Sequence, residues 1–223
     1  RIRVLGEFPR SDDDTMVPME LLESARSRDV EPSQFAEMVW GLDVARFGSD
    51  CSALAKRQGN AVTEPVRVWR NLDLMQLTGA VVAEYEAAAY EAKPSEILVD
   101  SIGLGAGVVD RLRELGLPAR GINVSESAAM MSNYRNLRAE LWGRAKAWLE
   151  RRDCLLPNDE RLVNELATVR YKFASNGKLQ IESKDDIRKR GLKSPDVADA
   201  FVLTFAGDAA VGVYGAGSSS GWS

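Results

Sequence analysis

Short apolar runs and alternating apolar positions divide the chain into segments that predict β-strands. The predicted strands lie at about 38–45, 52–58, 61–70, 96–100, 119–124, 171–173 and 178–181. The dipeptides Gly59-Asn60 and Asn176-Gly177 each separate two of these strands and are typical of tight hairpin turns. The first three strands are therefore expected to be antiparallel neighbours, and the last two to form a separate hairpin.

Between the strands, apolar residues recur every three or four positions, which is the spacing of an amphipathic helix. Asp73 is suited to cap one helix, and Pro195 to stand in the first turn of another. The predicted helices lie at about 18–26, 74–93, 108–115, 134–151, 159–169 and 195–206. The charged stretch 184–193 lacks this spacing and predicts a turn-like loop.

This order of elements predicts an α/β fold with a mixed central sheet flanked by helices. Residues 1–37 are poorly periodic apart from one short helix and are expected to be a lead-in or linker. Residues 38–208 are expected to form the folded domain, and the Gly/Ser-rich residues 209–223 a flexible tail. Because the chain starts at Arg1 and not at Met, it is expected to be a fragment of a longer protein.

Composition narrows the chemistry that this domain can perform. The 223 residues include no histidine, which removes the commonest general base and the serine–histidine triad. Cys51 and Cys154 have neither the number nor the spacing of a disulfide framework or a metal-binding motif, so they predict two reduced structural thiols. No apolar run approaches the ~20 residues of a membrane span. The net charge of −4 argues against indiscriminate coating of nucleic acid but allows a local basic groove.

Four aspartates stand out against their surroundings. Asp43 and Asp100 each end a strand that is otherwise apolar, where an unpaired carboxylate costs several kcal/mol. Asp196 and Asp199 are three residues apart in the last predicted helix and share one of its faces. Any one of these acids alone could be a turn or helix cap. If the two strands are neighbours, however, all four carboxylates can meet at one point.

Carboxylates that meet in this way repel each other, and one or two divalent cations would stabilise them. With only oxygen ligands available, Mg²⁺ or Mn²⁺ is favoured over Zn²⁺. An open carboxylate site of this kind suits two-metal phosphoryl chemistry.

Other polar positions permit both functional and structural interpretations. Asp50 could be a further ligand, but it is expected to cap the turn or to pair with Arg46. The three glycines of 103–107 could cradle a phosphate or allow a close approach of the backbone. The basic stretch beside the aspartate pair could be a solvated loop or could contact a phosphate backbone. The basic residues of helix 134–151 are expected to face solvent.

Three motifs containing the aspartates resemble the C-terminal nuclease domain of the tailed-phage terminase large subunit. They are Gly-Leu-Asp-Val-Ala-Arg-Phe-Gly-Ser-Asp at 41–50, Ile-Leu-Val-Asp-Ser-Ile-Gly at 97–103 and Ser-Pro-Asp-Val-Ala-Asp-Ala at 194–200. Residues 4–9 are also similar to the segment that joins the family's ATPase domain to this nuclease. The resemblance covers about residues 1–207. It implies a ribonuclease H-like fold and cleavage of concatemeric double-stranded viral DNA during genome packaging.

The resemblance also implies roles for individual residues. Asp43, Asp100 and Asp196 match the family's ligands for Mg²⁺ or Mn²⁺, and Asp199 is expected to assist a second ion or to orient a water. The residues expected to contact DNA are Arg46, Lys184, Arg188, Lys189, Arg190 and Lys193.

The resemblance implies partners as well. In the full-length protein these are an ATPase domain, the portal and the small terminase subunit, in the cytoplasm of the host cell. The chain contains no Walker A motif, so it is not itself the ATPase, and the isolated domain is expected to be monomeric.

Two other functions are compatible with parts of the pattern. A Holliday-junction-resolvase-like nuclease would share the acids but act on branched DNA as a dimer. A nucleotide-binding domain of the actin and sugar-kinase type also places Asp-Gly turns after its strands. That type needs two such domains and a Gly-rich adenosine motif, for which the chain has little room.

Overall fold

The computed structural model describes residues 14–45 and 50–207. Several predicted features therefore lie outside the described residues: the lead-in motif at 4–9, Arg46 with its predicted pairing to Asp50, and the tail at 209–223.

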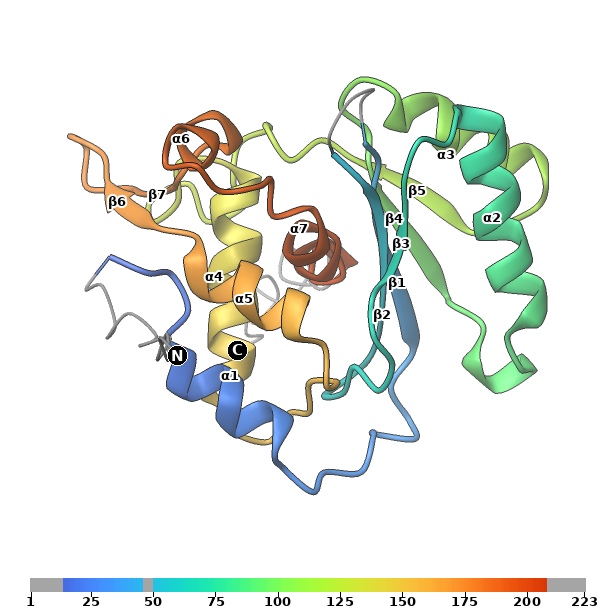
Figure 1. The fold of residues 1–223 in the computed structure, drawn as a ribbon, viewed down its shortest axis with the longest axis horizontal. Helices are drawn as coiled ribbons and strands as arrows, with labels where there is room; N and C mark the ends of the chain where they lie inside the picture. The colour runs from blue at the N-terminus through green and yellow to red at the C-terminus, as the bar shows by residue number, and fades with distance from the viewer. Residues whose placement is uncertain (1–13, 46–49, 208–223) are drawn as a thin grey trace, which may run out of the picture.

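A five-stranded mixed sheet forms the centre of the structure (Figure 1). Its strands lie in the order β3-β2-β1-β4-β5, with β1 antiparallel to β2, β2 antiparallel to β3, and β1, β4 and β5 parallel. Their bounds are β1 Met38–Asp43, β2 Ser52–Gln58, β3 Arg67–Trp69, β4 Glu96–Asp100 and β5 Ala119–Ile122. A separate antiparallel hairpin pairs β6 Tyr171–Phe173 with β7 Leu179–Ile181. The mixed sheet and the separate hairpin predicted from the sequence are both confirmed.

Eight helices occur in the described part of the chain, one of them a single 3₁₀ turn. They are α1 Met19–Arg26, α2 Leu74–Ala87, η1 Tyr90–Ala92, α3 Gly105–Glu114, α4 Leu137–Glu150, α5 Glu160–Thr168, α6 Lys184–Lys189 and α7 Asp196–Leu203. Asp73 caps α2 in a reciprocal capping box with Gln76, as expected for a helix start. α4 begins three residues later than predicted because Asn136 caps it, its side chain accepting a bond from the Ala139 amide.

Two predictions about segments need correction. Residues 184–189 form helix α6, capped by Ser183, and not a turn-like loop, because six residues are too few for a helical period to be visible in the sequence. The segment around α1 is also more than a lead-in. Val17, Leu22 and Ala25 are fully buried in the core, so these residues belong to the folded unit.

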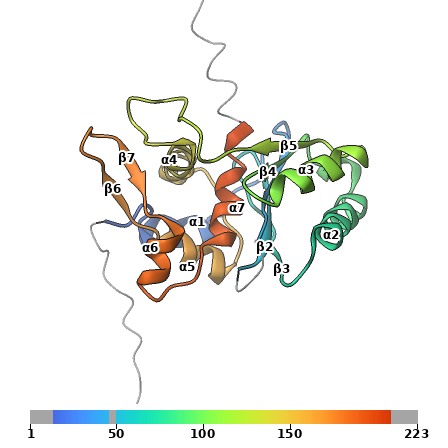
Figure 2. The same cartoon turned by 90° about the horizontal axis from the view of Figure 1, so that it is seen from above.

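Helices cover both faces of the sheet (Figure 2), and an apolar core lies on each side of it. On one face, α2 and α3 pack against β1 and β4 through residues such as Trp40, Ile97 and Val108. On the other face, α7 lies directly on the sheet, and α4, α5 and α1 pack behind it. α7 is therefore an inner layer, and all eight of its residues are buried. Within the described residues, no helix is long and apolar enough to cross a membrane.

Two glycines allow the close contacts on which this arrangement depends. A Cβ on Gly41 of β1 would lie 2.1 Å from the Ala200 carbonyl oxygen, so only glycine lets α7 approach the strand this closely. A Cβ on Gly105 would lie 1.7 Å from the Asp100 carbonyl oxygen. The sharp turn from β4 into α3 therefore accounts for one of the three glycines that could have cradled a phosphate.

Candidate functional site

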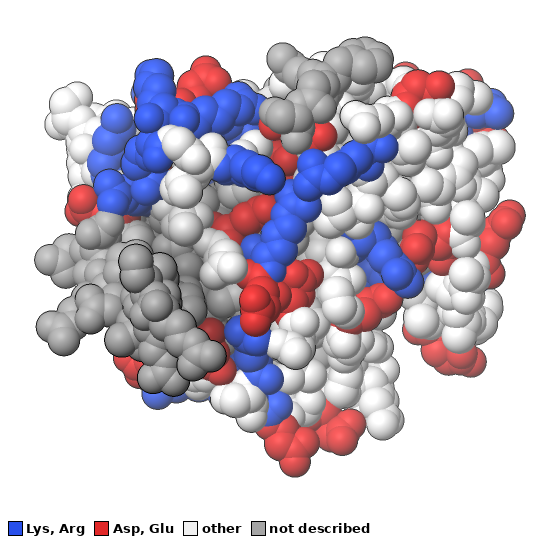
Figure 3. Space-filling view, viewed as in Figure 1, with Lys and Arg blue, Asp and Glu red and all other residues white. Residues whose placement is uncertain are grey.

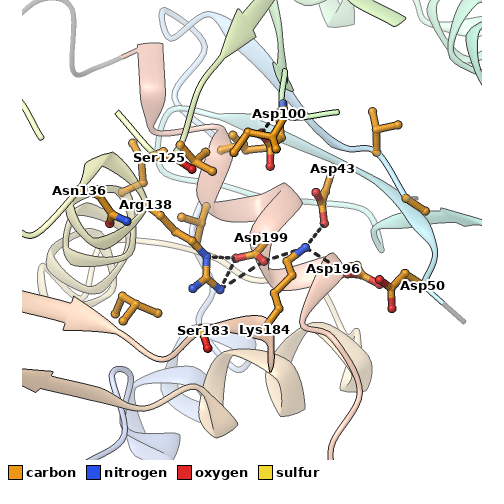
Figure 4. A pocket seen from close by; sticks show the side chains of 18 of the residues that line it. Asp43, Asp50, Asp100, Ser125, Asn136, Arg138, Ser183, Lys184, Asp196 and Asp199 are labelled. Atoms are coloured by element: carbon orange, nitrogen blue, oxygen red, sulfur yellow. Dashed lines mark hydrogen bonds and ion pairs between the residues drawn. The ribbon is translucent and has the colours of Figure 1, made fainter. Parts of the chain in front are cut away.

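The four aspartates surround a pocket of about 410 Å³ at the edge of the sheet where β1 and β4 end (Figure 4). Leu42 pairs with Val99 in the parallel ladder, so the next residues, Asp43 and Asp100, follow at the same edge. Asp196 and Asp199 reach the pocket from the first turn of α7. This helix can lie close to β1 because Gly41 in that strand has no side chain. The structure thus brings together four acids that the sequence separates by up to 156 positions.

The Lys184 side chain, from the start of α6, lies among three of these acids. Its Nζ is 3.0 Å from Asp43 Oδ2, 3.3 Å from Asp196 Oδ1 and 3.3 Å from Asp199 Oδ2 (Figure 4). The three aspartates are almost fully buried, with exposed fractions of 3–8%. A single ammonium therefore provides the shared positive charge for carboxylates from two different elements.

Asp199 has two further partners, both on α4. Arg138 Nη2 donates to Asp199 Oδ1 at 3.0 Å, and Trp142 Nε1 donates to the same oxygen at 3.1 Å. Sequence analysis placed Arg138 on a solvent face and did not consider Trp142. No local signal could have identified them, because the contacts join residues 61 and 57 positions apart.

The other two acids each accept a backbone bond. Asp100 Oδ1 accepts from the Ile102 amide at 3.1 Å, across the turn into α3. Asp196 Oδ2 accepts from the Cys51 amide at 3.1 Å, while its Oδ1 faces Lys184. These bonds fix the orientation of each carboxylate toward the pocket.

Burial and charge perturb the pKa values of these groups in different directions. Burial, together with the nearby carboxylates, raises the pKa of Asp43 to about 7 despite the Lys184 ammonium beside it. Burial also raises the pKa of Asp100. For Asp199 burial acts in the same sense, but the charges of Arg138 and Lys184 outweigh it and hold the pKa below its usual value. Burial disfavours the Lys184 ammonium, but the carboxylates of Asp43, Asp199 and Asp196 outweigh it and raise the pKa of Lys184.

Solved structures with a similar fold were found, although no protein-family profile and no curated protein sequence matches the chain. The nuclease domain of the large terminase subunit gp2 of bacterial virus Sf6 is 23% identical, with a TM-score of 0.71 over 85% of this chain and 97% of that one. The large terminase nuclease of thermophilic phage G20c, determined with bound magnesium, is 15% identical, with a TM-score of 0.63 over 86% of this chain and 97% of that one.

The chain has the fold of a terminase nuclease domain. The ribonuclease H-like fold expected from the sequence is thereby confirmed. A mutant of the Sf6 domain was determined with manganese and beta-thujaplicinol, at 22% identity and a TM-score of 0.69 over 85% of this chain and 97% of that one.

The charge of the pocket fits a divalent cation. Five carboxylates and three cationic side chains line it, and Asp50 with Arg188 forms one ion pair among them at 2.7 Å. With every carboxyl ionised, the remaining imbalance is two negative charges in a largely buried site, which a hard divalent cation with oxygen ligands would neutralise. As the described residues stand, no three acids or thiols are close enough to hold a metal ion together. Instead, the Lys184 ammonium lies among three of the acids and supplies a positive charge there.

The basic residues expected to contact DNA lie mostly on α6 and just after it. Lys and Arg side chains gather on the surface over α6 and the β6–β7 hairpin (Figure 3). Several of them have acidic partners. Arg188 pairs with Asp50 at 2.7 Å, Lys189 with Asp186 at 2.9 Å, and Arg190 with Glu182 at 2.7 Å. Lys193 is exposed, whereas Lys184 is turned into the acid cluster.

Both cysteines are buried free thiols, as expected. Cys51 lies beside the site, since its amide holds Asp196, whereas Cys154 lies in the core behind α7.

Proposed function

We propose that this chain is a divalent-metal-dependent endonuclease that cleaves double-stranded DNA by two-metal phosphodiester hydrolysis. The observation that carries the proposal is the convergence of Asp43, Asp196 and Asp199 on one ammonium, with Asp100 in the same pocket. The similarity in fold to terminase nuclease domains with bound magnesium or manganese supports it.

Asp43, Asp100 and Asp196 would hold Mg²⁺ or Mn²⁺. Asp43 is the central member, because β1 lies between β2 and β4 and packs against α7. Such ions activate a water and stabilise the leaving oxygen of an in-line displacement. The charges of Arg138 and Lys184 hold the pKa of Asp199 low, so Asp199 would stay ionised and would assist a second ion or orient a water.

Lys184 would have two roles. Without a metal it neutralises part of the acid cluster, and once cations are bound its ammonium would be released toward the DNA phosphate. Residues of α6 and β7 line the pocket, so the basic surface over α6 and the β6–β7 hairpin (Figure 3) would contact the phosphate backbone beside it without reading the sequence.

The biological setting is part of the proposal. By its fold, the domain would cut concatemeric viral DNA during packaging, as part of a terminase large subunit with an ATPase domain, a portal and a small subunit as partners in the host cytoplasm.

The test is divalent-dependent plasmid cleavage by Asp43→Asn. This change keeps the shape of the side chain but removes its charge, so we expect loss of cleavage in Mn²⁺ while the circular dichroism spectrum stays unchanged. Asp110→Asn is the matched control, because Asp110 is exposed on α3, on the far side of the sheet. Cleavage by Asp43→Asn at the rate of the control would overturn the proposal.

Two further substrates separate the alternatives. Preferential cutting of a four-way junction over linear duplex would favour a resolvase-like enzyme. Binding of ATP would favour the nucleotide-binding type, although the described residues contain one five-stranded sheet where that type needs two domains.

A further inference from the structure

The N-terminus of α7 carries both Asp196 and Asp199, so the position of this helix end determines the geometry of the site. The first turn of any helix leaves backbone N–H groups without partners inside the helix. The residue before α7 is Pro195, which makes no side-chain cap. Another group must therefore accept these bonds if the turn is to be rigid.

Glu165, on α5, supplies that acceptor. Its Oε2 accepts from the amide of Val197 at 2.8 Å and from the amide of Ala198 at 3.0 Å. The carboxylate is largely buried, with its side chain 14% exposed. A negative charge at this position also interacts favourably with the positive end of the helix dipole, which would otherwise oppose a cation bound near Asp196.

Arg161, one turn earlier on α5, connects Glu165 to the other side of the site. Its Nε donates to Glu165 Oε1 at 2.7 Å, and its Nη2 donates to Cys51 Sγ at 2.9 Å. The Cys51 amide in turn donates to Asp196 Oδ2. The contacts thus form a closed ring from α7 through α5 to the start of β2 and back to Asp196.

This ring holds Asp196 at two points, its backbone turn and one carboxylate oxygen. The other oxygen, Oδ1, remains directed to the pocket, where it lies 3.3 Å from Lys184 Nζ. Neither Glu165 nor Arg161 lines the pocket. They can therefore act on a bound cation only through Asp196 and α7.

We propose that Glu165, supported by Arg161, is a positioning residue that fixes the first turn of α7 and thereby presents Asp196 to a divalent cation. This inference rests on the proposed nuclease function and goes beyond it by assigning a role to residues outside the pocket. Residues that orient metal ligands typically change metal affinity by about 10–100-fold when they are lost.

The experiment measures Mn²⁺ affinity by isothermal titration calorimetry in the absence of DNA. Glu165→Ala removes the acceptor of both amides, and we expect it to weaken Mn²⁺ binding by about 10-fold or more. Glu165→Gln retains one oxygen that can accept both amide bonds but loses the charge and the bond from Arg161, so it should weaken Mn²⁺ binding less than Glu165→Ala does. Binding of a short duplex in chelator, measured by fluorescence anisotropy, should be the same for all three proteins.

Asp73→Ala is the matched control. It also removes a helix cap, but from α2, which packs on the opposite face of the sheet. It should lower the melting temperature without changing Mn²⁺ affinity, which separates loss of positioning from loss of stability.

The outcomes distinguish this inference from the proposed function. If the unchanged protein neither binds Mn²⁺ nor cuts DNA, the proposed function fails. If it does both and Glu165→Ala binds Mn²⁺ equally well, the positioning role is wrong. Equal weakening by Glu165→Ala and Glu165→Gln would also overturn it, because the two amide bonds that Glu165→Gln retains would then make no difference. Should Glu165→Ala not fold, Glu165→Asp replaces it, since its shorter side chain cannot keep both amide contacts.

Discussion

The buried Asp43 carboxyl makes the stability of the metal-free fold depend on pH. Its pKa is about 7 in the folded chain, against a usual value of 3.8. Between these two values the folded protein retains a proton that the unfolded chain has lost. The free energy of unfolding therefore falls as pH rises from about 4 to about 7. Above pH 7 Asp43 is ionised in both states, and its destabilising effect on the fold is complete.

The size of this effect has an upper bound. Each pKa unit corresponds to about 1.4 kcal/mol, so the difference between the two states amounts to at most about 4 kcal/mol. Asp43→Asn removes the charge but also takes one of three carboxylates from Lys184, which keeps Asp196 and Asp199. We therefore expect Asp43→Asn to raise the free energy of unfolding at pH 8 by about 2 kcal/mol.

The assay is thermal and urea unfolding in chelator from pH 5 to pH 8. For a chain of this size, about 2 kcal/mol corresponds to a rise in melting temperature of roughly 4–8 °C. The gain should shrink toward pH 5, where Asp43 is already protonated in the folded protein. The exposed Asp110→Asn should match the unchanged protein at every pH.

Two results would refute the reasoning. One is an Asp43→Asn protein that is less stable than the unchanged protein at pH 8. The other is a gain that does not depend on pH. A less stable protein would mean that Lys184 compensates the Asp43 charge fully, so that burial does not dominate. A gain independent of pH would mean that it does not come from the ionisation of Asp43. A stabilised but inactive Asp43→Asn would show that the site is retained for function at the expense of stability.

Two further substitutions test the packing and the charge of the site. Gly41→Ala should lower the free energy of unfolding by about 3 kcal/mol in urea unfolding, because its Cβ would overlap the Ala200 carbonyl. Gly79→Ala in α2 has open space around it and should instead stabilise by up to about 1 kcal/mol, so a similar loss in both variants would contradict the close-contact explanation. Lys184→Met should tighten Mn²⁺ binding in calorimetry by about 10-fold, because it removes the cation that competes for three carboxylates. Weaker Mn²⁺ binding by Lys184→Met would mean that the ammonium helps to hold the acids in place.

Local patterns in the sequence were enough to predict most of the elements. The strand ending at Asp100 has the predicted bounds, and Asp73 caps a helix as expected, because both signals come from residues within one turn or one strand. The sequence also predicted that Asp43 and Asp100 would be adjacent if their two strands were neighbours, and the pairing of β1 with β4 confirms this condition. The short helix α6 and the burial of α1 did not follow, because both depend on packing against distant elements.

The sequence by itself determined which acids are available at the site, because an aspartate at the end of an apolar strand is visible without a structure. Only the tertiary structure decided what surrounds them. Lys184 reaches Asp43 across 141 positions, and Arg138 reaches Asp199 across 61. Such contacts depend on how α4, α5 and α6 pack around α7, and no local period encodes that packing. For this reason the cations that balance the site, and the Glu165 carboxylate that fixes its helix, became visible only in the folded chain.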